Sequence, residues 1–174
     1  ANRELSGAEI ELISIRERDQ RLKKTLGPVM DRYDYILIDC PPSLSMLTLN
    51  ALCFANGVIV PMQCEYFALE GLTDLVASIR RVHNEKNPGL RIISILRVMF
   101  DPRITLQQQV SEQLKKHFGD KVFNTIIPRN VRLAEAPSYG KPGVVYDRSS
   151  RGAMAYKAFA DEIISRMEAK KKNG

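Results

Sequence analysis

Short apolar runs alternate along this chain with longer amphipathic segments. The apolar runs show little polar alternation, which is typical of strands covered on both faces of a parallel sheet. The predicted strands are residues 35–40, 58–60, 91–98 and 122–127. The predicted helices are residues 6–26, 44–56, 66–87, 104–118 and 149–168. Strands that alternate with helices predict an α/β fold with a doubly wound, mostly parallel sheet and right-handed crossovers.

Local signals set the expected boundaries of these elements. Ser6 and Glu9 have the spacing of a capping box at the start of the first helix. Pro61 and Pro128 are expected to stop the second and fourth strands, because proline cannot donate to a ladder. A polar loop or short helix is expected up to Tyr146. Because no strand precedes the first helix, the sheet is predicted to be truncated on its N-terminal side.

The length and composition are those of one globular domain. We expect a single α/β domain over residues 1–174, with a disordered basic tail at residues 169–174. No apolar run approaches the ~20 residues of a membrane span, and no signal peptide is visible. The first residue is Ala1 rather than methionine, so we expect a processed product or an excised piece of a longer protein.

The cysteines are Cys40, Cys53 and Cys64. An odd number in a chain without an export signal indicates free thiols in a reducing cytoplasm. A metal site is the alternative. The spacing disfavours it, because the sequence has no C-x-x-C pair and both histidines are remote.

Asp39 is the first candidate functional residue. It ends the apolar run at residues 35–38 and is followed, after Cys40, by two prolines. Ligands of open α/β sheets bind at the carboxyl ends of the strands, and an aspartate placed there can hold the Mg²⁺ of a bound nucleotide. The alternative is that Asp39 only caps the turn or the next helix.

Positive charge is concentrated in the second half of the chain. The net charge is +6, and residues 97–151 hold 10 basic but only 5 acidic residues. Residues 1–96 hold 11 basic and 12 acidic residues. This asymmetry suggests a polyanionic partner for the second half, although a merely basic surface would give the same composition.

Several stretches, in order and correctly spaced, resemble the ParA/Soj-type partition ATPases. Residues 35–43 (Tyr-Ile-Leu-Ile-Asp-Cys-Pro-Pro-Ser) resemble the Walker B region of that family. The other matching stretches are residues 60–71, 99–103 with 109–110, 126–137 with 140–142, and 146–147 with 150–152. The similarity runs from about Leu5 to Met167 and implies a P-loop NTPase fold of the deviant Walker A (SIMIBI) type.

The resemblance also implies a function. In this family ATP, with Mg²⁺, joins two monomers into a homodimer, and the dimer binds double-stranded DNA without sequence preference. A centromere-binding partner of the ParB type then stimulates ATP hydrolysis and releases the DNA. The expected location is the bacterial cytoplasm, at the nucleoid, with no membrane partner.

Particular residues follow from the resemblance. Asp39 would be the Walker B aspartate, acting on Mg²⁺ indirectly through water. Arg103 and Arg132 fall on the family's DNA-contacting arginines, although each could be an ordinary or ion-paired surface arginine. Lys141, Arg148 and Arg151 could extend that basic patch or form a solvated face. The purine pocket would involve Met99, Pro128, Arg129 and Asn130, for which simple loop packing is the alternative.

The family's phosphate-binding loop is absent from these residues. No Gly-Lys-Thr or Gly-Lys-Ser occurs anywhere in the chain. Without that loop we expect this chain alone to bind no ATP or Mg²⁺ and not to hydrolyse ATP efficiently. It would be either the C-terminal portion of an ATPase or a truncated paralogue. Strand edges left uncovered also predict self-association.

The sequence departs from the ParA/Soj pattern at two places, and two alternative functions are also compatible with it. Arg97 stands where many relatives have threonine, and Ile104-Thr105 replaces the common Thr-Asn. A non-enzymatic DNA-binding or regulatory paralogue is one alternative. A MinD-like membrane switch is the other, but residues 166–174 lack the apolar face that an amphipathic membrane helix requires.

Overall fold

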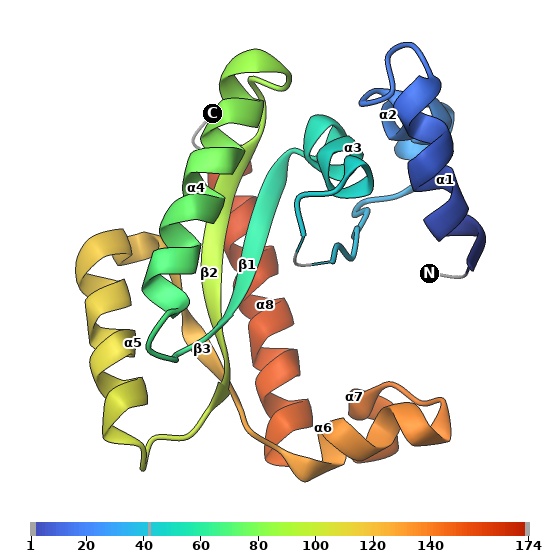
Figure 1. The fold of residues 1–174 in the computed structure, drawn as a ribbon. Helices are drawn as coiled ribbons and strands as arrows, with labels where there is room; N and C mark the ends of the chain where they lie inside the picture. Colours follow the sequence, from blue (N-terminus) through green and yellow to red (C-terminus); the bar gives the residue numbers. More distant parts are fainter. Residues whose placement is uncertain (1–2, 42, 173–174) are drawn as a thin grey trace. The chain divides into compact units, whose positions relative to one another are not determined.

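The computed structural model describes residues 3–41 and 43–172 (Figure 1). The helices are α1 (Arg3–Ser14), α2 (Arg21–Leu26), α3 (Met46–Phe54), α4 (Ala68–Glu85), α5 (Thr105–Phe118), α6 (Val131–Glu135), α7 (Gly143–Tyr146) and α8 (Arg151–Lys172). The strands are β1 (Gly57–Gln63), β2 (Arg91–Phe100) and β3 (Val122–Pro128). The 3₁₀ segments are η1 (Gly27–Arg32), η2 (Gly119–Lys121) and η3 (Ala136–Tyr139).

The chain forms two compact units. The first comprises the chain up to Val58 together with Asp74–Arg91, and the second comprises Ile59–Thr73 together with the chain from Ile92 onward. The second unit holds most of the sheet and all of α5 to α8. The single α/β domain expected over residues 1–174 stays a prediction.

In the first unit, α3 is capped by two separate side chains. The Ser45 hydroxyl accepts hydrogen bonds from the backbone N–H groups of Leu47 and Thr48. The Glu9 carboxylate of α1 accepts from the N–H of Met46, at 3.2 Å. These contacts satisfy donors that the first turn of a helix would otherwise leave unpaired. Glu9 therefore caps a helix distant in sequence. The capping box was predicted with Ser6 at the start of the first helix, but α1 begins at Arg3, so Ser6 lies within the helix.

The single helix predicted over residues 6–26 is wrong. The structure begins α1 at Arg3, breaks the helix after Ser14 and starts α2 at Arg21. Glu17, between the two helices, has a φ of 56°, in the left-handed region. Residues 16–20 are all polar, so a continuous helix there would have no apolar face to bury.

The strand predicted at residues 35–40 is also wrong. These residues form no strand in the structure, and the side chain of Leu37 is 88% exposed. A strand requires a hydrogen-bonded neighbour. Among the residues that the structure describes, no segment pairs with this one. The described chain therefore has three strands where the sequence predicted four.

The sheet has the order β1-β2-β3, and β2 and β3 run parallel. Ile95 pairs with Val122, Arg97 with Ile126, and Phe100 with Pro128. Pro61 was expected to end the second strand, but β1 continues through it to Gln63. Proline is tolerated on an edge strand, where its missing N–H faces solvent, and Pro61 is exposed. The predicted α/β fold with a parallel sheet is confirmed.

Helix α8 packs on one face of the sheet. Leu96 and Phe123 form a buried cluster with Ile127, against which Phe159 and Ile163 of α8 pack. The rings of Phe123 and Phe159 meet edge to face with centroids 4.9 Å apart. On the opposite face lies α5 (Figure 1). These apolar contacts fix α8 along β2 and β3.

Glu162 ties α8 to the backbone of β3. Its carboxylate accepts hydrogen bonds from the N–H groups of Asn124 (2.9 Å) and Thr125 (2.8 Å), and from Nη2 of Arg166 (2.8 Å). Burial acts to raise the pKa of Glu162, but these hydrogen bonds outweigh it and lower the pKa to about 2. The ionised carboxylate is therefore part of the packed structure.

Helix α8 continues through Lys172, into the segment expected to be a disordered tail. The last two positions of that expected tail, 173 and 174, lie outside the described residues. Within the part of the chain that the structure describes, no helix is both long and apolar enough to cross a membrane.

Candidate functional site

The four residues predicted to contact a nucleotide lie at one end of the sheet. Met99 is the next-to-last residue of β2, and Pro128 ends β3. Pro128 pairs with Phe100, and the N–H of Arg129 donates to the carbonyl of Phe100 at 3.3 Å. Asn130 follows directly. The structure thus brings the carboxyl end of β2 and the loop after β3 together, at the edge where open α/β sheets bind ligands. The resemblance had assigned these residues to a purine pocket, and that role stays a prediction.

Met99 has an unusual backbone conformation. Its φ is 51°, in the left-handed region that non-glycine residues seldom adopt. The register between β2 and β3 shifts between Arg97 and Phe100, so β2 contains one extra residue there. Such bulges re-aim a side chain at the end of a strand. The side chain of Met99 is 45% exposed, which leaves an apolar surface at this end of the sheet.

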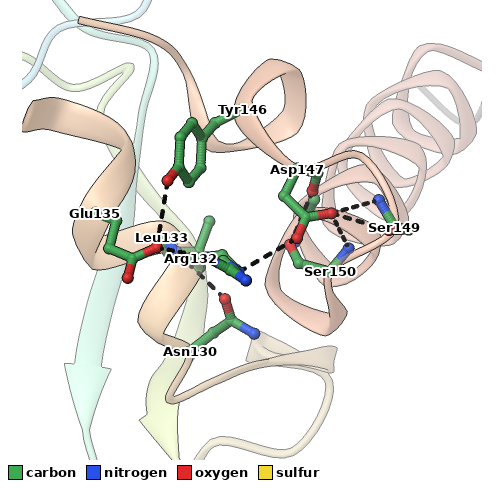
Figure 2. Close-up of polar contacts among 9 residues, drawn as sticks. Asn130, Arg132, Leu133, Glu135, Tyr146, Asp147, Ser149 and Ser150 are labelled. Carbon is green, nitrogen blue, oxygen red and sulfur yellow. Dashed lines mark hydrogen bonds and ion pairs between the residues drawn. The ribbon is translucent and has the colours of Figure 1, made fainter. Parts of the chain in front are cut away.

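Asn130 fixes the start of α6, the helix that carries Arg132. Its side-chain oxygen accepts a hydrogen bond from the N–H of Leu133 at 3.2 Å (Figure 2). Asparagine is among the preferred residues at this capping position. The predicted nucleotide residue Asn130 therefore has a structural role in the described chain.

Leu133 joins α6 to α7 and α8. A Cβ added at Gly152 would lie 2.6 Å from Leu133 Cδ1 and 3.1 Å from Asn130 Cβ. A Cβ added at Gly143 would also collide with the Leu133 side chain. Only glycine admits so close an approach at both places. We call this arrangement of Leu133 between Gly143 and Gly152 the leucine seat.

Arg132 lies between two carboxylates from different elements (Figure 2). Its Nη1 is 3.0 Å from Glu135 Oε2, and its Nε is 3.6 Å from Asp147 Oδ2. The hydroxyl of Tyr146 donates to the same Glu135 oxygen at 3.3 Å. The Glu135 carboxylate raises the pKa of Arg132. The arginine predicted to contact DNA is therefore ion-paired.

Asp147 is held by the start of α8. It accepts hydrogen bonds from the N–H (3.1 Å) and hydroxyl (2.9 Å) of Ser149 and from the N–H of Ser150 (3.1 Å). The bond from the Ser149 hydroxyl is the main reason that the pKa of Asp147 is lowered, and Arg132 adds to it. The carboxylate that faces Arg132 is thus ionised and fixed in position.

Arg103 is paired in a different way. Its Nε and Nη2 donate to the two carboxylate oxygens of Asp101, at 2.9 and 2.6 Å. The Arg103 side chain is nevertheless 87% exposed. The paired guanidinium lowers the pKa of Asp101. The exposure suits a contact with DNA, whereas the pairing leaves no net charge at this pair.

Asp39 and the cysteines lie apart from these features in the sequence. Asp39 is exposed and belongs to the first unit, in the segment that forms no strand. Its Walker B role stays a prediction. Cys40 is exposed, whereas Cys53 and Cys64 are buried. Over residues 3–41 and 43–172, no group of three or more histidine, cysteine or acidic residues is placed to hold a metal.

The two departures from the family pattern differ in their surroundings. Arg97 is buried between β2 and α5, where it donates to Ser111 Oγ (2.8 Å) and to the carbonyl of Phe123 (2.6 Å). Burial lowers the pKa of Arg97. Its Nε has no hydrogen-bond partner among the described residues. Ile104, by contrast, is exposed before α5. Arg97 is therefore a packing residue of the second unit.

The ion-pair partners of Arg132, Glu135 and Asp147, were not predicted from the sequence. Glu135 stands three residues after Arg132, a spacing that favours an ion pair on a helix. Asp147 is followed, after Arg148, by two serines, a pattern of helix starts. Nothing local, however, predicts that Asp147 faces Arg132.

Comparison with known proteins gives the class and then the family. Residues 1–92 match a family described as "AAA domain". An uncharacterized Pseudomonas putida protein is 58% identical over 95% of this chain and 63% of its own length. The chromosome-partitioning ATPase Soj of Treponema pallidum is 54% identical over 95% of this chain and 66% of its own length. The chromosome partitioning protein ParA of Caulobacter vibrioides is 49% identical over 95% of this chain and 63% of its own length.

Solved structures of similar proteins have the same fold. Cobyrinic acid a,c-diamide synthase from Mycobacterium smegmatis is 33% identical with a TM-score of 0.80, over 98% of this chain and 62% of its own. A plasmid partition protein from Borrelia burgdorferi is 28% identical with a TM-score of 0.59, over 76% and 54%. The fold is that of the P-loop NTPases of the ParA/MinD type. This chain belongs to the ParA/Soj family, and it spans 63% of the length of the Pseudomonas relative.

Proposed function

We propose that this chain is the DNA-contacting and Walker B portion of a ParA-type partition ATPase. In the whole protein, ATP-dependent dimers would bind duplex DNA without sequence preference, and a ParB-type partner would stimulate hydrolysis and release. The observation that carries the proposal is the meeting of a basic segment with the predicted purine residues at one end of the sheet. The naming of the Soj and ParA relatives as partitioning proteins supports it.

The basic segment is residues 129–152. It holds five basic and two acidic residues. Four of its cations are exposed and have no carboxylate partner among the described residues, namely Arg129, Lys141, Arg148 and Arg151. Cations of this kind bind the phosphate backbone, which gives affinity without sequence preference.

The nucleotide would lie against Met99 and Pro128. Both offer apolar surface that suits the face of a purine, and ligand sites are mostly apolar. Asp39 would act on the Mg²⁺ of the nucleotide. The triphosphate, however, needs a glycine-rich loop with lysine, and these 174 residues contain no Gly-Lys-Thr or Gly-Lys-Ser. The residues present fit a purine but not its phosphates, so the chain alone is expected not to hydrolyse ATP.

A binding experiment tests the proposal. A fluorescent duplex of arbitrary sequence is titrated with the chain at 50 and 200 mM salt, and calorimetry measures ATP–Mg²⁺ binding. We expect weak, salt-sensitive DNA binding and no ATP binding. Arg148→Ala and Arg151→Ala, which remove unpaired cations of the segment, should each flatten the slope of log K against log salt by about 0.9, the value for one phosphate contact.

The matched control is Arg81→Ala. Arg81 is an exposed arginine that pairs with Glu85 on the same helix, at 3.9 Å. If all three substitutions reduce affinity equally, the basic segment has no special role. DNA binding without any nucleotide response, even after a glycine-rich, lysine-containing P-loop segment is joined to the chain, would favour the non-enzymatic DNA-binding alternative.

A further inference from the structure

Arg132 does not present a net positive charge in this structure. It is the single cation of a group that contains two carboxylates, Glu135 at 3.0 Å and Asp147 at 3.6 Å (Figure 2). With both acids ionised, the group has a net charge of −1. A phosphate that approached it would meet an excess of negative charge. Arg132 therefore differs from Arg148 and Arg151, which pair with no carboxylate among the described residues.

The two carboxylates are fixed by contacts that do not involve Arg132. Glu135 is on the same helix as Arg132 and accepts a hydrogen bond from the hydroxyl of Tyr146. Asp147 is fixed by the backbone and hydroxyl groups at the start of α8. The leucine seat packs α6, which carries Glu135, against α8, whose start holds Asp147. The arrangement is thus built into the fold and is not the chance meeting of three mobile side chains.

We propose that Glu135 and Asp147 form an acidic clamp that withholds Arg132 from DNA phosphates, so that opening the clamp raises the affinity for DNA. The proposal rests on the proposed binding of DNA by residues 129–152. It assigns to the two acids a regulatory role at that surface. While Arg132 is paired with Glu135 and Asp147, which we call the closed state, the phosphate contacts come from the unpaired cations of residues 129–152.

The expected effect follows from counterion release. A freed Arg132 adds one phosphate contact, which steepens the slope of log K against log salt by about 0.9 and tightens binding about eightfold at 0.1 M salt. Removing one carboxylate leaves the other in place, so a single substitution should give only part of this gain. The Glu135 contact is the shorter, so its removal should give the larger part.

The test compares the affinity of clamp variants for a fluorescent duplex. The variants are Glu135→Gln, Asp147→Asn and the two combined. Glutamine and asparagine keep an oxygen that can accept the bonds from Tyr146 and from the start of α8. A thermal melt checks that each variant is folded. The matched control is Asp74→Asn combined with Glu85→Gln on α4, which changes the net charge by the same amount away from the clamp.

The double clamp variant should bind about eightfold more tightly than the control double variant at 0.1 M salt. The gain should vanish when Arg132→Ala is added, because the freed cation is then missing. Equal gains in the clamp and control variants, or a gain that survives Arg132→Ala, would overturn the clamp. Absence of DNA binding by every variant, the unsubstituted chain included, would instead refute the proposed function on which the clamp rests.

Discussion

Replacing Gly152 by alanine tests the leucine seat directly. The added Cβ would lie 2.6 Å from Leu133 Cδ1, 2.7 Å from Leu133 Cγ and 3.1 Å from Asn130 Cβ. Carbon atoms in favourable contact lie about 3.5–4.0 Å apart, so Leu133 must move by roughly 1 Å. Overpacking of this kind costs about 1–3 kcal/mol. Alanine recovers up to about 1 kcal/mol of helix propensity. We expect a net loss of roughly 1–2 kcal/mol in the free energy of unfolding.

The assay is urea unfolding followed by circular dichroism, with Gly71→Ala as the matched control. Gly71 is also helical, in α4, but a Cβ there would meet no atom within 4 Å. Its replacement should raise the free energy of unfolding by about 0.5–1 kcal/mol. The same chemical change is therefore expected to have opposite signs at the two sites.

Equal stability of Gly152→Ala and Gly71→Ala would contradict a collision between the added Cβ and Leu133. A further variant tests whether the added methyl group destabilises the helix independently of Leu133. Leu133→Ala combined with Gly152→Ala removes the collision. In that background the added methyl at Gly152 should no longer destabilise, although the loss of the leucine itself will. If the added methyl group lowers the free energy of unfolding equally without Leu133, the destabilisation arises within the helix and not from the contact with Leu133.

Three other outcomes follow from the structure. Arg97→Ala should lower the free energy of unfolding by about 2–4 kcal/mol in a urea titration, because it leaves a cavity and unpaired acceptors. The pKa of Glu162 is lowered from 4.5 to about 2, so its stabilisation is present above about pH 4.5 and is lost between about pH 4.5 and 2. Glu162→Gln should therefore flatten the stability–pH profile in that window while lowering stability at neutral pH. Finally, Cys40 should react with a thiol reagent well before the buried Cys53 and Cys64 in the folded chain, and equal rates for all three would contradict their burial.

Local pattern predicted most of the helices. Residues 44–56, 66–87 and 104–118 became α3, α4 and α5 with shifts of at most two residues at each end, because an apolar face at helical spacing is a property of the segment itself. The apolar run at residues 35–40 predicted a strand, but pairing depends on a neighbouring strand that no local pattern contains. The polar stretch at residues 16–20 broke a helix that periodicity on either side of it suggested.

The candidate site was predictable to a similar degree. The resemblance grouped Met99 with Pro128, and in the structure both lie at the carboxyl ends of neighbouring strands; their nucleotide role stays a prediction. The surroundings of Arg132 could be predicted only in part. Glu135 is visible from its spacing, whereas Asp147 is 15 positions away in the sequence. Its approach depends on the close contact of α6 with α7 and α8, which Gly143 and Gly152 make possible.

The leucine seat has a consequence for how this surface would meet a duplex. It joins α6 to the start of α8, so the backbone that carries the unpaired Arg148 and Arg151 is held against α6 as one platform. Phosphates along a duplex recur at the same spacing whatever the bases. A platform of cations on a preformed backbone would match any stretch of duplex and would lose little backbone entropy on contact. Indifference to base sequence would then arise from the rigidity of this surface.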